Sequence, residues 1–271
     1  MGLQASARCS QWQRGTWTAF GKTHVTPRTH RTFQLTGLTE RGLNIESNRE
    51  EMGNCTLGKS GATHAALLNL DADVRSAGAV LEEQVRLRRP WHKWCASYAL
   101  GNRYADGNDT VGPHSDFLGD LGPRPIIVGL TLGACRPFVL QRKVGGSDKL
   151  TIPLPHNSAI VMWGDCQENW HHSVPRCSGR AIGRHRLSGT VRFSLTFRMN
   201  RRECLPGLGK CHCGKPASLK CVKGRYVVFC HPNTGNCGFM KSCEWATEEA
   251  RRLRLLDEGE RPKQNSEGEK Q

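Results

Sequence analysis

Short runs of β-forming residues, each bounded by glycine or proline, fill the middle of this chain and restrict its fold more than any other feature. Aliphatic and β-branched residues dominate five such runs, at 125–132, 138–142, 150–153, 158–163 and 190–198. Runs of this length, with turn residues between them, predict the strands of an antiparallel sandwich or barrel. The sequence therefore predicts a mainly β core.

A single amphipathic helix is expected ahead of these strands, over residues 71–89. Its apolar residues recur at the spacing of one helical face, at Val74, Ala77, Leu81 and Val85. Pro90 ends the pattern. One helix followed by several short strands predicts a double-stranded β-helix, or jelly roll, with helical support.

Length and composition exclude two classes of protein. The chain has 271 residues, of which 37% are hydrophobic and 23% are charged. These values exclude a fully disordered chain. An apolar run long enough for a membrane-spanning helix is absent from the sequence, so a protein that spans the membrane with helices is the second class excluded. Residues 1–60 are polar with weak periodicity, so we expect an irregular N-terminal segment.

The net charge of +15 is concentrated in one stretch of the chain. Residues 176–225 hold thirteen Lys and Arg side chains and one acid, Glu203. Concentrated positive charge is typical of a protein that binds a polyanion, because each neutralised phosphate releases condensed counterions. Composition alone favours this interpretation and a solvated basic surface equally.

Candidate metal ligands lie within the β-rich part. His114 and Asp116 are two residues apart, and the pair His171–His172 follows later in the sequence. On an extended segment, residues i and i+2 project to the same side, so an imidazole and a carboxylate there can bind one ion. Two histidines and one carboxylate form the facial triad of non-haem Fe(II) oxygenases. His-x-Asp by itself is a common chance pattern.

Two arginines strengthen this interpretation. Arg192 and Arg198 lie six residues apart on the predicted strand 190–198, so a regular strand projects both to the same side. Two guanidinium groups inside a barrel are costly unless an anion meets them. A dicarboxylate bound between the metal and an arginine would remove that cost. Two surface arginines on an edge strand are the alternative.

Four motifs in fixed order resemble the AlkB family of 2-oxoglutarate- and Fe(II)-dependent dioxygenases, which remove alkyl groups from nucleic-acid bases. The motifs are Asn102-Arg103-Tyr104-x-x-Gly107, His114-x-Asp116, His172-Ser173-Val174-Pro175, and Arg192 with Arg198 in R-x-S-L-T-F-R. The similarity covers residues 92–200. Residues 132–138 resemble the nuclear DNA-repair branch of the family, which implies a nuclear location.

The resemblance implies a role for each matching residue. The implied iron ligands are His114, Asp116 and His172, with His171 as the rival third ligand. The implied 2-oxoglutarate-binding residues are Asn102, Tyr104, Arg192 and Arg198. Arg192 would hold the distal carboxylate, and Arg198 would contact the end nearer the iron. The implied reaction oxidises an N-alkyl carbon on a DNA base and releases it as an aldehyde, formaldehyde for a methyl group.

The chain departs from the family pattern at one position near the metal. The second residue after the metal-binding aspartate is often acidic in the family and helps to hold the damaged base, but here it is Leu118. Asp120 is the alternative acid. Residues 26–29 with Phe33 resemble the family's nucleotide-recognition lid, so Arg28 is an expected nucleic-acid contact.

A cysteine-rich segment follows the β-rich part, with seven of the thirteen cysteines between Cys204 and Cys243. Residues 1–15 lack the apolar stretch of a secretory signal, so we expect these thiols to bind metal, with disulfides as the alternative. Two pairs of cysteines, each pair close together in the sequence, are typical of a closed tetrahedral zinc site: Cys211 with Cys213, and Cys230 with Cys237. His212 and His231 are alternative ligands.

The cysteine-rich segment also resembles the GRF-type zinc finger. The resemblance rests on the C-x-C-G start, Gly224-Arg225-Tyr226, and Cys237-Gly238-Phe239 with Trp245. The finger of that family binds single-stranded DNA through cations for phosphates and an aromatic ring for base stacking. The implied contacts are Lys215, Lys220, Lys223, Arg225 and Tyr226. A structural or protein-binding knuckle is the alternative.

These patterns predict four segments and three cofactors. The segments are an irregular 1–60 or divergent substrate lid, a dioxygenase domain 61–200, a zinc finger 204–246, and a polar tail 247–271 that begins as a short helix over 247–256. The cofactors are Fe(II), 2-oxoglutarate and Zn(II). The expected partner is DNA, single-stranded or with a flipped-out base, and we expect a monomer without a membrane partner. An RNA demethylase and a non-catalytic nucleic-acid-binding protein are the alternatives.

Overall fold

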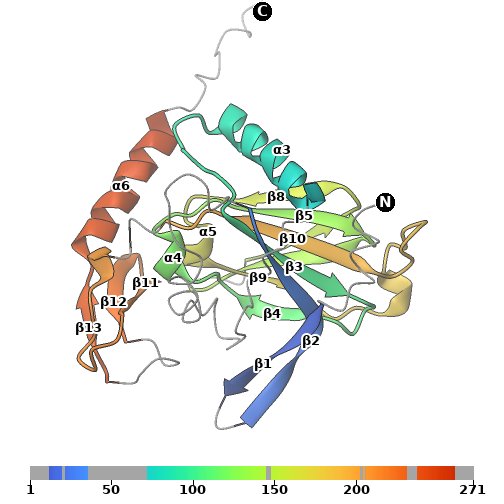
Figure 1. The fold of residues 1–271 in the computed structure, drawn as a ribbon, viewed down its shortest axis with the longest axis horizontal. Helices are drawn as coiled ribbons and strands as arrows, with labels where there is room; N and C mark the ends of the chain where they lie inside the picture. The colour runs from blue at the N-terminus through green and yellow to red at the C-terminus, as the bar shows by residue number, and fades with distance from the viewer. Residues whose placement is uncertain are drawn as a thin grey trace, which may run out of the picture.

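The computed structural model describes residues 12–19, 22–35, 72–144, 148–201, 204, 206–230 and 237–259. Two antiparallel sheets form the larger part of the molecule (Figure 1). The six-stranded sheet has the order β1 (Gln13–Ala19), β2 (Lys22–Gln34), β3 (Tyr98–Tyr104), β10 (Arg192–Arg198), β5 (Ile127–Gly133) and β8 (Ser158–Met162). The four-stranded sheet has the order β4 (Val111–His114), β9 (Trp170–Val174), β6 (Arg136–Arg142) and β7 (Lys149–Leu154).

Strand β10 separates two hydrophobic clusters because its residues alternate between the faces of the sheet. Leu195 and Phe197 are fully buried in a cluster with residues of helix α3 (Ala72–Arg88), which covers the outer face of the six-stranded sheet (Figure 1). Arg192 and Arg198 point the other way, toward the second sheet. A second cluster, with members from both sheets, fills the space between them: Tyr104, Leu121, Ile127, Phe138, Leu154, Met162 and Val174.

This arrangement is consistent with the predicted mainly β jelly roll. Helix α3 spans 72–88 where the sequence predicts 71–89, and each of the five predicted runs overlaps an observed strand, so these predictions are confirmed. Short helices α4 (Leu118–Leu121) and α5 (Cys166–Asn169) connect the strands near the end of β4 and the start of β9. Among the described residues, no helix is both long and apolar enough to cross a lipid bilayer.

The prediction of an irregular segment over 1–60 is wrong for its described part. Strands β1 and β2 pair as a hairpin, and residues 29–34 of β2 pair with β3. The hairpin extends beyond the sheet (Figure 1). The hairpin sequence gives little hydrophobic signal because much of it is threonine and arginine. Backbone pairing holds the hairpin together. At its base, Phe33 and Leu35 are buried against α3. Residues 1–11, 20–21 and 36–60 lie outside the described residues.

The cysteine-rich segment forms a separate small module of three strands and a helix. Strands β11 (Ser218–Val222), β12 (Arg225–Phe229) and β13 (Met240–Ser242) form an antiparallel sheet. Helix α6 (Glu244–Gly259) follows directly. The predicted boundary between residues 246 and 247 therefore falls inside α6, which is longer at both ends than the predicted helix 247–256. Residues 260–271 of the predicted tail lie outside the described residues.

The module is fixed to the jelly roll through α6 (Figure 1). Arg124 pairs with Asp257 of α6 at 2.8 Å, and both side chains are buried. Arg201 pairs with Glu249 at 2.9 Å, in a half-exposed position. The sequence leaves only a short tether between β10 and the cysteine module, which predicts this close placement.

Candidate metal centre and co-substrate pocket

His114 and His172 face each other across neighbouring strands. They are register partners on β4 and β9, and their ring centroids are 4.2 Å apart. Asp116 lies two residues after His114, and its Oδ1 is 3.8 Å from the Nε2 atom of each histidine. One ligand atom from each of the three residues lies within 4.8 Å of the others. The spacing suits a single ion bound by two imidazoles and one carboxylate.

His114 is the most exposed residue of the cluster. The His114 side chain is 37% exposed, whereas those of Asp116 and His172 are 7% and 8% exposed. The His114 Nδ1–H donates to the carbonyl of Gly112 at 2.8 Å, which leaves Nε2 as the ligand atom facing the cluster. The exposed edge of the cluster is therefore the His114 side, on β4.

The protonation states of the cluster suit metal binding. Burial lowers the pKa of His172 to about 3, with a further contribution from His114, so its imidazole is neutral at physiological pH. Burial alone would raise the pKa of the Asp116 carboxyl, but the Arg198 guanidinium, together with His172 and His114, outweighs burial and holds the pKa well below its ordinary range. A neutral imidazole and an ionised carboxylate are the forms that coordinate a divalent cation.

Arg198 and Gln167 hold Asp116 from two directions. Arg198 Nε donates to Asp116 Oδ2 at 2.7 Å, and both side chains are buried. The backbone N–H of Asp116 donates to the side-chain oxygen of Gln167 at 2.8 Å. Sequence reasoning placed Arg198 on 2-oxoglutarate, and that contact stays a prediction. It missed Gln167, which is far from Asp116 in the chain and carries no metal-type chemistry.

His171, the rival third ligand, lies next to His172 on β9 but is not part of the cluster of ligand atoms. Adjacent side chains on a strand project to opposite faces, so only one of the two can face His114. His172 is the one that does, because it is the register partner of His114.

Arg192 lies deeper in the jelly roll with its guanidinium only partly paired. The residue is 1% exposed, and its Nη2 donates to Thr131 Oγ1 at 2.9 Å. The Nε and Nη1 groups have no hydrogen-bond partner in the described part of the chain. The Tyr104 ring centroid lies 5.3 Å from the guanidinium carbon. Buried, unpaired N–H groups are costly, and a carboxylate would satisfy both of them. The sequence did not indicate Thr131.

Asn102 projects from the same face of the sheet as Tyr104 and Arg192, and Arg28 orients it. Arg28 Nε donates to Asn102 Oδ1 at 2.7 Å, and its Nη1 donates to the Thr110 carbonyl at 3.3 Å. Because the amide oxygen of Asn102 accepts from Arg28, its NH₂ group remains as a donor for a carboxylate. Arg28, predicted as a nucleic-acid contact, therefore lies against the expected 2-oxoglutarate-binding residues.

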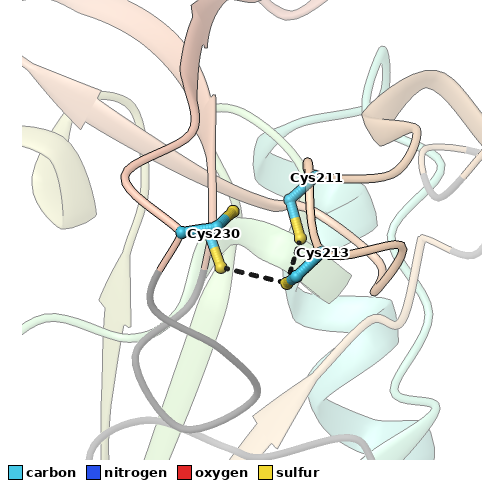
Figure 2. Close-up of side chains that lie close together, drawn as sticks. Cys211, Cys213 and Cys230 are labelled. Atoms are coloured by element: carbon cyan, nitrogen blue, oxygen red, sulfur yellow. Dashed lines mark hydrogen bonds between the residues drawn. The ribbon is translucent and has the colours of Figure 1, made fainter.

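A second metal-type cluster lies in the small module. One sulfur from each of Cys211, Cys213, Cys230 and Cys237 lies within 4.8 Å of the others. Figure 2 shows three of these side chains converging, with 3.0 Å between the sulfurs of Cys211 and Cys213 and 3.7 Å between those of Cys213 and Cys230. Hydrogen bonding, chiefly from the Phe239 backbone, lowers the pKa of Cys237 to about 6. Four thiols in this arrangement suit a tetrahedral zinc ion.

Of the two alternative zinc ligands, His212 is not brought to this cluster. His212 packs against the Phe239 ring, with 4.9 Å between centroids, and is not among the clustered ligand atoms. His231 lies outside the described residues.

The predicted nucleic-acid contacts of the module separate into two groups. Lys215, Lys223 and Arg225 are exposed, and Lys220 is half-buried with its ammonium 4.3 Å from the centre of the Phe229 ring. Tyr226, predicted to stack on a base, is 5% exposed, and its hydroxyl donates to Glu168 Oε1 at 2.8 Å. The stacking prediction is therefore wrong, because the Tyr226 ring is buried in the module's apolar cluster.

The surroundings of Leu118 explain why an acidic residue, expected at this position, is absent. Its side chain is 5% exposed and belongs to the hydrophobic cluster of the small module, with Leu219, Tyr226 and Val228. A carboxylate at this position would be buried among apolar groups. Asp120, the alternative acid, lies on α4, is half-exposed, and is not part of the metal-type cluster.

Comparison with known protein families agrees with this geometry. A family model described as the 2OG-Fe(II) oxygenase superfamily matches residues 8–198. The chain belongs to this superfamily. The match begins ahead of the β1–β2 hairpin and ends at Arg198, so the hairpin that the sequence did not predict is part of the oxygenase.

This oxygenase is also similar to named relatives over part of its length. It is 34% identical to human "DNA oxidative demethylase ALKBH2" over 86 residues, which are 29% of this chain and 33% of the relative. It is 34% identical to the Arabidopsis thaliana protein of the same name, over 37% of this chain and 36% of the relative. It is 35% identical to bovine "Alpha-ketoglutarate-dependent dioxygenase alkB homolog 3", over 36% of this chain and 35% of the relative.

The matched segment therefore spans about a third of the length of each of these relatives. Among solved structures, OsALKBH1 superposes with a TM-score of 0.44 at 14% identity, over 73% of this chain and 92% of that one. This structural likeness is too distant for a residue-level comparison.

Proposed function

We propose that this oxygenase removes N-alkyl groups from nucleic-acid bases, with Fe(II) and 2-oxoglutarate as cofactor and co-substrate. The observation that carries the proposal is the His114–Asp116–His172 cluster combined with the buried, unpaired N–H groups of Arg192. The names of the similar relatives support the substrate class, since they include DNA oxidative demethylases.

In this proposal the three clustered residues hold the iron, and Arg192, Asn102 and Tyr104 hold 2-oxoglutarate. Iron with 2-oxoglutarate and oxygen supplies the oxidation of the N-alkyl carbon. The chain fits both: the cluster has the ligand types of a facial triad, and the Arg192 N–H groups can pair with a carboxylate. Arg198 keeps the Asp116 carboxylate ionised and oriented. A contact between Arg198 and 2-oxoglutarate itself stays part of the proposal.

Apolar side chains shield the His172 side of the cluster from water. The Phe138 ring stacks on His172, with 5.7 Å between centroids, and belongs to the apolar cluster between the two sheets. This apolar wall leaves the His114 side as the route for the base. A base must leave the stack to reach a site of this depth, and a lesion that blocks pairing lowers the cost of doing so.

We also propose that the cysteine cluster binds zinc and that the module binds single-stranded DNA. Exposed Lys215, Lys223 and Arg225 support the second proposal, since cations on one small module can follow a phosphate backbone. The β1–β2 hairpin and the module flank the sheet that carries β4 (Figure 1). A strand that lies over His114 would run between them. A module that only supports the fold is the competing interpretation.

The remaining elements of the proposal are a monomer that acts in the nucleus and an oxygenase unit ending near residue 200. DNA is favoured over RNA because the similar relatives include proteins named DNA oxidative demethylases.

The proposal is tested by product formation on matched oligonucleotides. The full chain is incubated with Fe(II) and 2-oxoglutarate and with single-stranded DNA that carries 1-methyladenine or 3-methylcytosine, beside the RNA of the same sequence. We expect formaldehyde and succinate in equal amounts, with DNA the better substrate, and neither product with Asp116→Ala. Succinate without formaldehyde would mean an oxygenase with a different substrate, and a better RNA substrate would establish the alternative.

A further inference from the structure

One hydrophobic residue links the iron-site segment to the small module. Leu118 lies two residues after Asp116, yet its side chain belongs to the module's apolar cluster. Every other member of that cluster in the described part of the chain comes from residue 208 or later. The cluster therefore holds the end of a segment whose beginning is a candidate iron ligand. If the module loosens, the Asp116–Leu118 segment loses one of its two fixed ends.

A second link runs through the short helix α5, where adjacent side chains contact the two parts of the molecule. Gln167 accepts from the backbone N–H of Asp116 at 2.8 Å. Its neighbour Glu168 accepts from the Tyr226 hydroxyl, also at 2.8 Å. Glu168 is 6% exposed and Gln167 is 1% exposed, so water does not compete for either contact. The position of Tyr226 thus bears on α5 and, through α5, on the backbone of Asp116.

The cysteine cluster fixes Tyr226 within the module. Strand β12 carries Tyr226 and leads directly to Cys230. The Cys230 N–H donates to the Phe239 carbonyl, and the Cys243 N–H donates to the Tyr226 carbonyl, both at 2.9 Å. A unit this small has a limited apolar core, and a structural metal ion adds to its folding free energy. Zinc loading would therefore strengthen the positions of Tyr226 and of the apolar cluster around Leu118.

We propose that the zinc-loaded module positions Asp116 for iron, so that occupancy of the cysteine cluster raises the affinity of the jelly roll for Fe(II). This inference rests on the two metal sites of the proposed function. Tyr226 and Leu118 act as positioning residues, since neither belongs to the cluster of iron-ligand atoms. Coupling between binding sites is reciprocal, so iron loading also strengthens zinc retention.

Because the ion pairs of α6 attach the module to the jelly roll, the contact between Tyr226 and Glu168 can be removed without detaching the module. Arg124–Asp257 and Arg201–Glu249 attach the module to the jelly roll without involving Tyr226. Loss of the Tyr226 hydroxyl therefore removes the contact with Glu168 and leaves both the attachment and the cysteine cluster intact. Lys241, an exposed residue on β13, provides a control in the same sheet.

The test compares full-length wild type, Tyr226→Phe and Lys241→Ala. Zinc content is measured by elemental analysis, and Fe(II) affinity by anaerobic equilibrium dialysis. We expect one zinc per chain in all three proteins. Tyr226→Phe should bind Fe(II) about tenfold more weakly, the lower end of the range for residues that support metal ligands, and Lys241→Ala should match wild type. Unchanged Fe(II) affinity in zinc-loaded Tyr226→Phe would overturn the proposed coupling.

A second measurement does not depend on the variant or on iron. Hydrogen exchange of the full-length wild type is compared before and after zinc removal with a chelator. Faster exchange in residues 115–119 is expected after zinc removal, whereas unchanged exchange there, with faster exchange confined to the module, would contradict the link. If wild type binds no zinc or no Fe(II), the proposed metal sites themselves fail, which is distinct from two occupied sites that do not influence each other.

Discussion

Arg198 and Asp116 form a buried ion pair, with Arg198 Nε donating to Asp116 Oδ2 at 2.7 Å. The pair holds a candidate iron ligand in its ionised form before any metal arrives. Replacing Arg198 by methionine leaves this carboxylate buried without a counter-charge. We expect Arg198→Met to bind Fe(II) about 10- to 100-fold more weakly in anaerobic dialysis. Arg184→Met, at an exposed arginine after β9, should bind iron as wild type does. Equal affinity in the two variants would exclude this role for Arg198.

Arg192 should control 2-oxoglutarate rather than iron. Two of its buried N–H groups have no partner among the described residues, and two charge-assisted hydrogen bonds contribute about 3 kcal/mol together. Arg192→Met should therefore weaken 2-oxoglutarate binding by about 100-fold. Iron affinity should change little. The measurement is calorimetric titration of the iron-loaded protein without oxygen, with exposed Arg186→Met as control. Retained 2-oxoglutarate affinity in Arg192→Met would show that the carboxylate binds elsewhere.

Arg28 should act on the co-substrate through Asn102. The 2.7 Å hydrogen bond orients the Asn102 amide, and its loss removes about 1 kcal/mol. Arg28→Met should raise the KM for 2-oxoglutarate about fivefold, a change that follows from that free energy. The salt dependence of DNA binding should be unchanged. A shallower salt dependence with an unaltered KM would instead make Arg28 a phosphate contact.

Arg225 should contribute to DNA binding through charge alone. It is exposed at the start of β12, beside the turn that holds Lys223. Arg225→Ala should weaken binding uniformly across sequences and reduce the slope of log K against log salt by about 1. Fluorescence anisotropy with single-stranded DNA at several salt concentrations measures this slope. Arg88→Ala, an exposed arginine on α3, is the matched control. The same slope in both variants would assign the module a purely structural role.

Asp257 should make attachment of α6 dependent on pH. Burial alone would raise the pKa of this carboxyl, but hydrogen bonds from Arg124, Trp91 and His92 lower it below the ordinary value. A lowered folded-state pKa contributes stability that is complete above the unfolded value, about 3.9, and is lost as the pH falls through the folded value. Asp257→Asn should therefore lower the free energy of unfolding by about 2 kcal/mol at neutral pH.

Urea unfolding at a series of pH values checks this prediction. The difference between wild type and Asp257→Asn should shrink below about pH 4, since the unfolded pKa lies there. Glu258→Gln changes a neighbouring exposed carboxyl and should have little effect at any pH. A difference that stays constant down to acidic pH would show that the ionised form of Asp257 does not stabilise the fold.

The periodic elements of the fold were predictable from the sequence. Helix α3 buries Val74, Leu81 and Val85 on one face, and β10 alternates apolar residues with polar ones, so local pattern alone identifies both elements. Strands β3, β4 and β9 were missed. They carry the polar and charged residues of the site, such as Asn102, His114 and His172, and these residues interrupt the hydrophobic alternation that marks a strand.

The site was predictable where motif spacing reflects local geometry. Arg192 and Arg198 share one face of β10, so strand geometry predicts that both project toward the second sheet. The spacing of His114 and Asp116 indicated a shared ligand site, although β4 ends at His114. Tyr226 was predicted wrongly because its environment depends on a tertiary contact with Glu168, 58 residues away in sequence. The role of Leu118 was hidden for the same reason. No local pattern in the sequence indicates that a second module covers these side chains.

The most direct test of the proposed activity is the intact mass of a single-stranded oligonucleotide that carries one 1-methyladenine. It is measured after incubation with the full-length protein, Fe(II), 2-oxoglutarate and oxygen. We predict that wild type lowers the mass of the oligonucleotide by that of one CH₂ group and that Asp116→Ala leaves the mass unchanged. An oligonucleotide that keeps its methyl group with iron-loaded wild type would contradict the proposed dealkylation of this lesion.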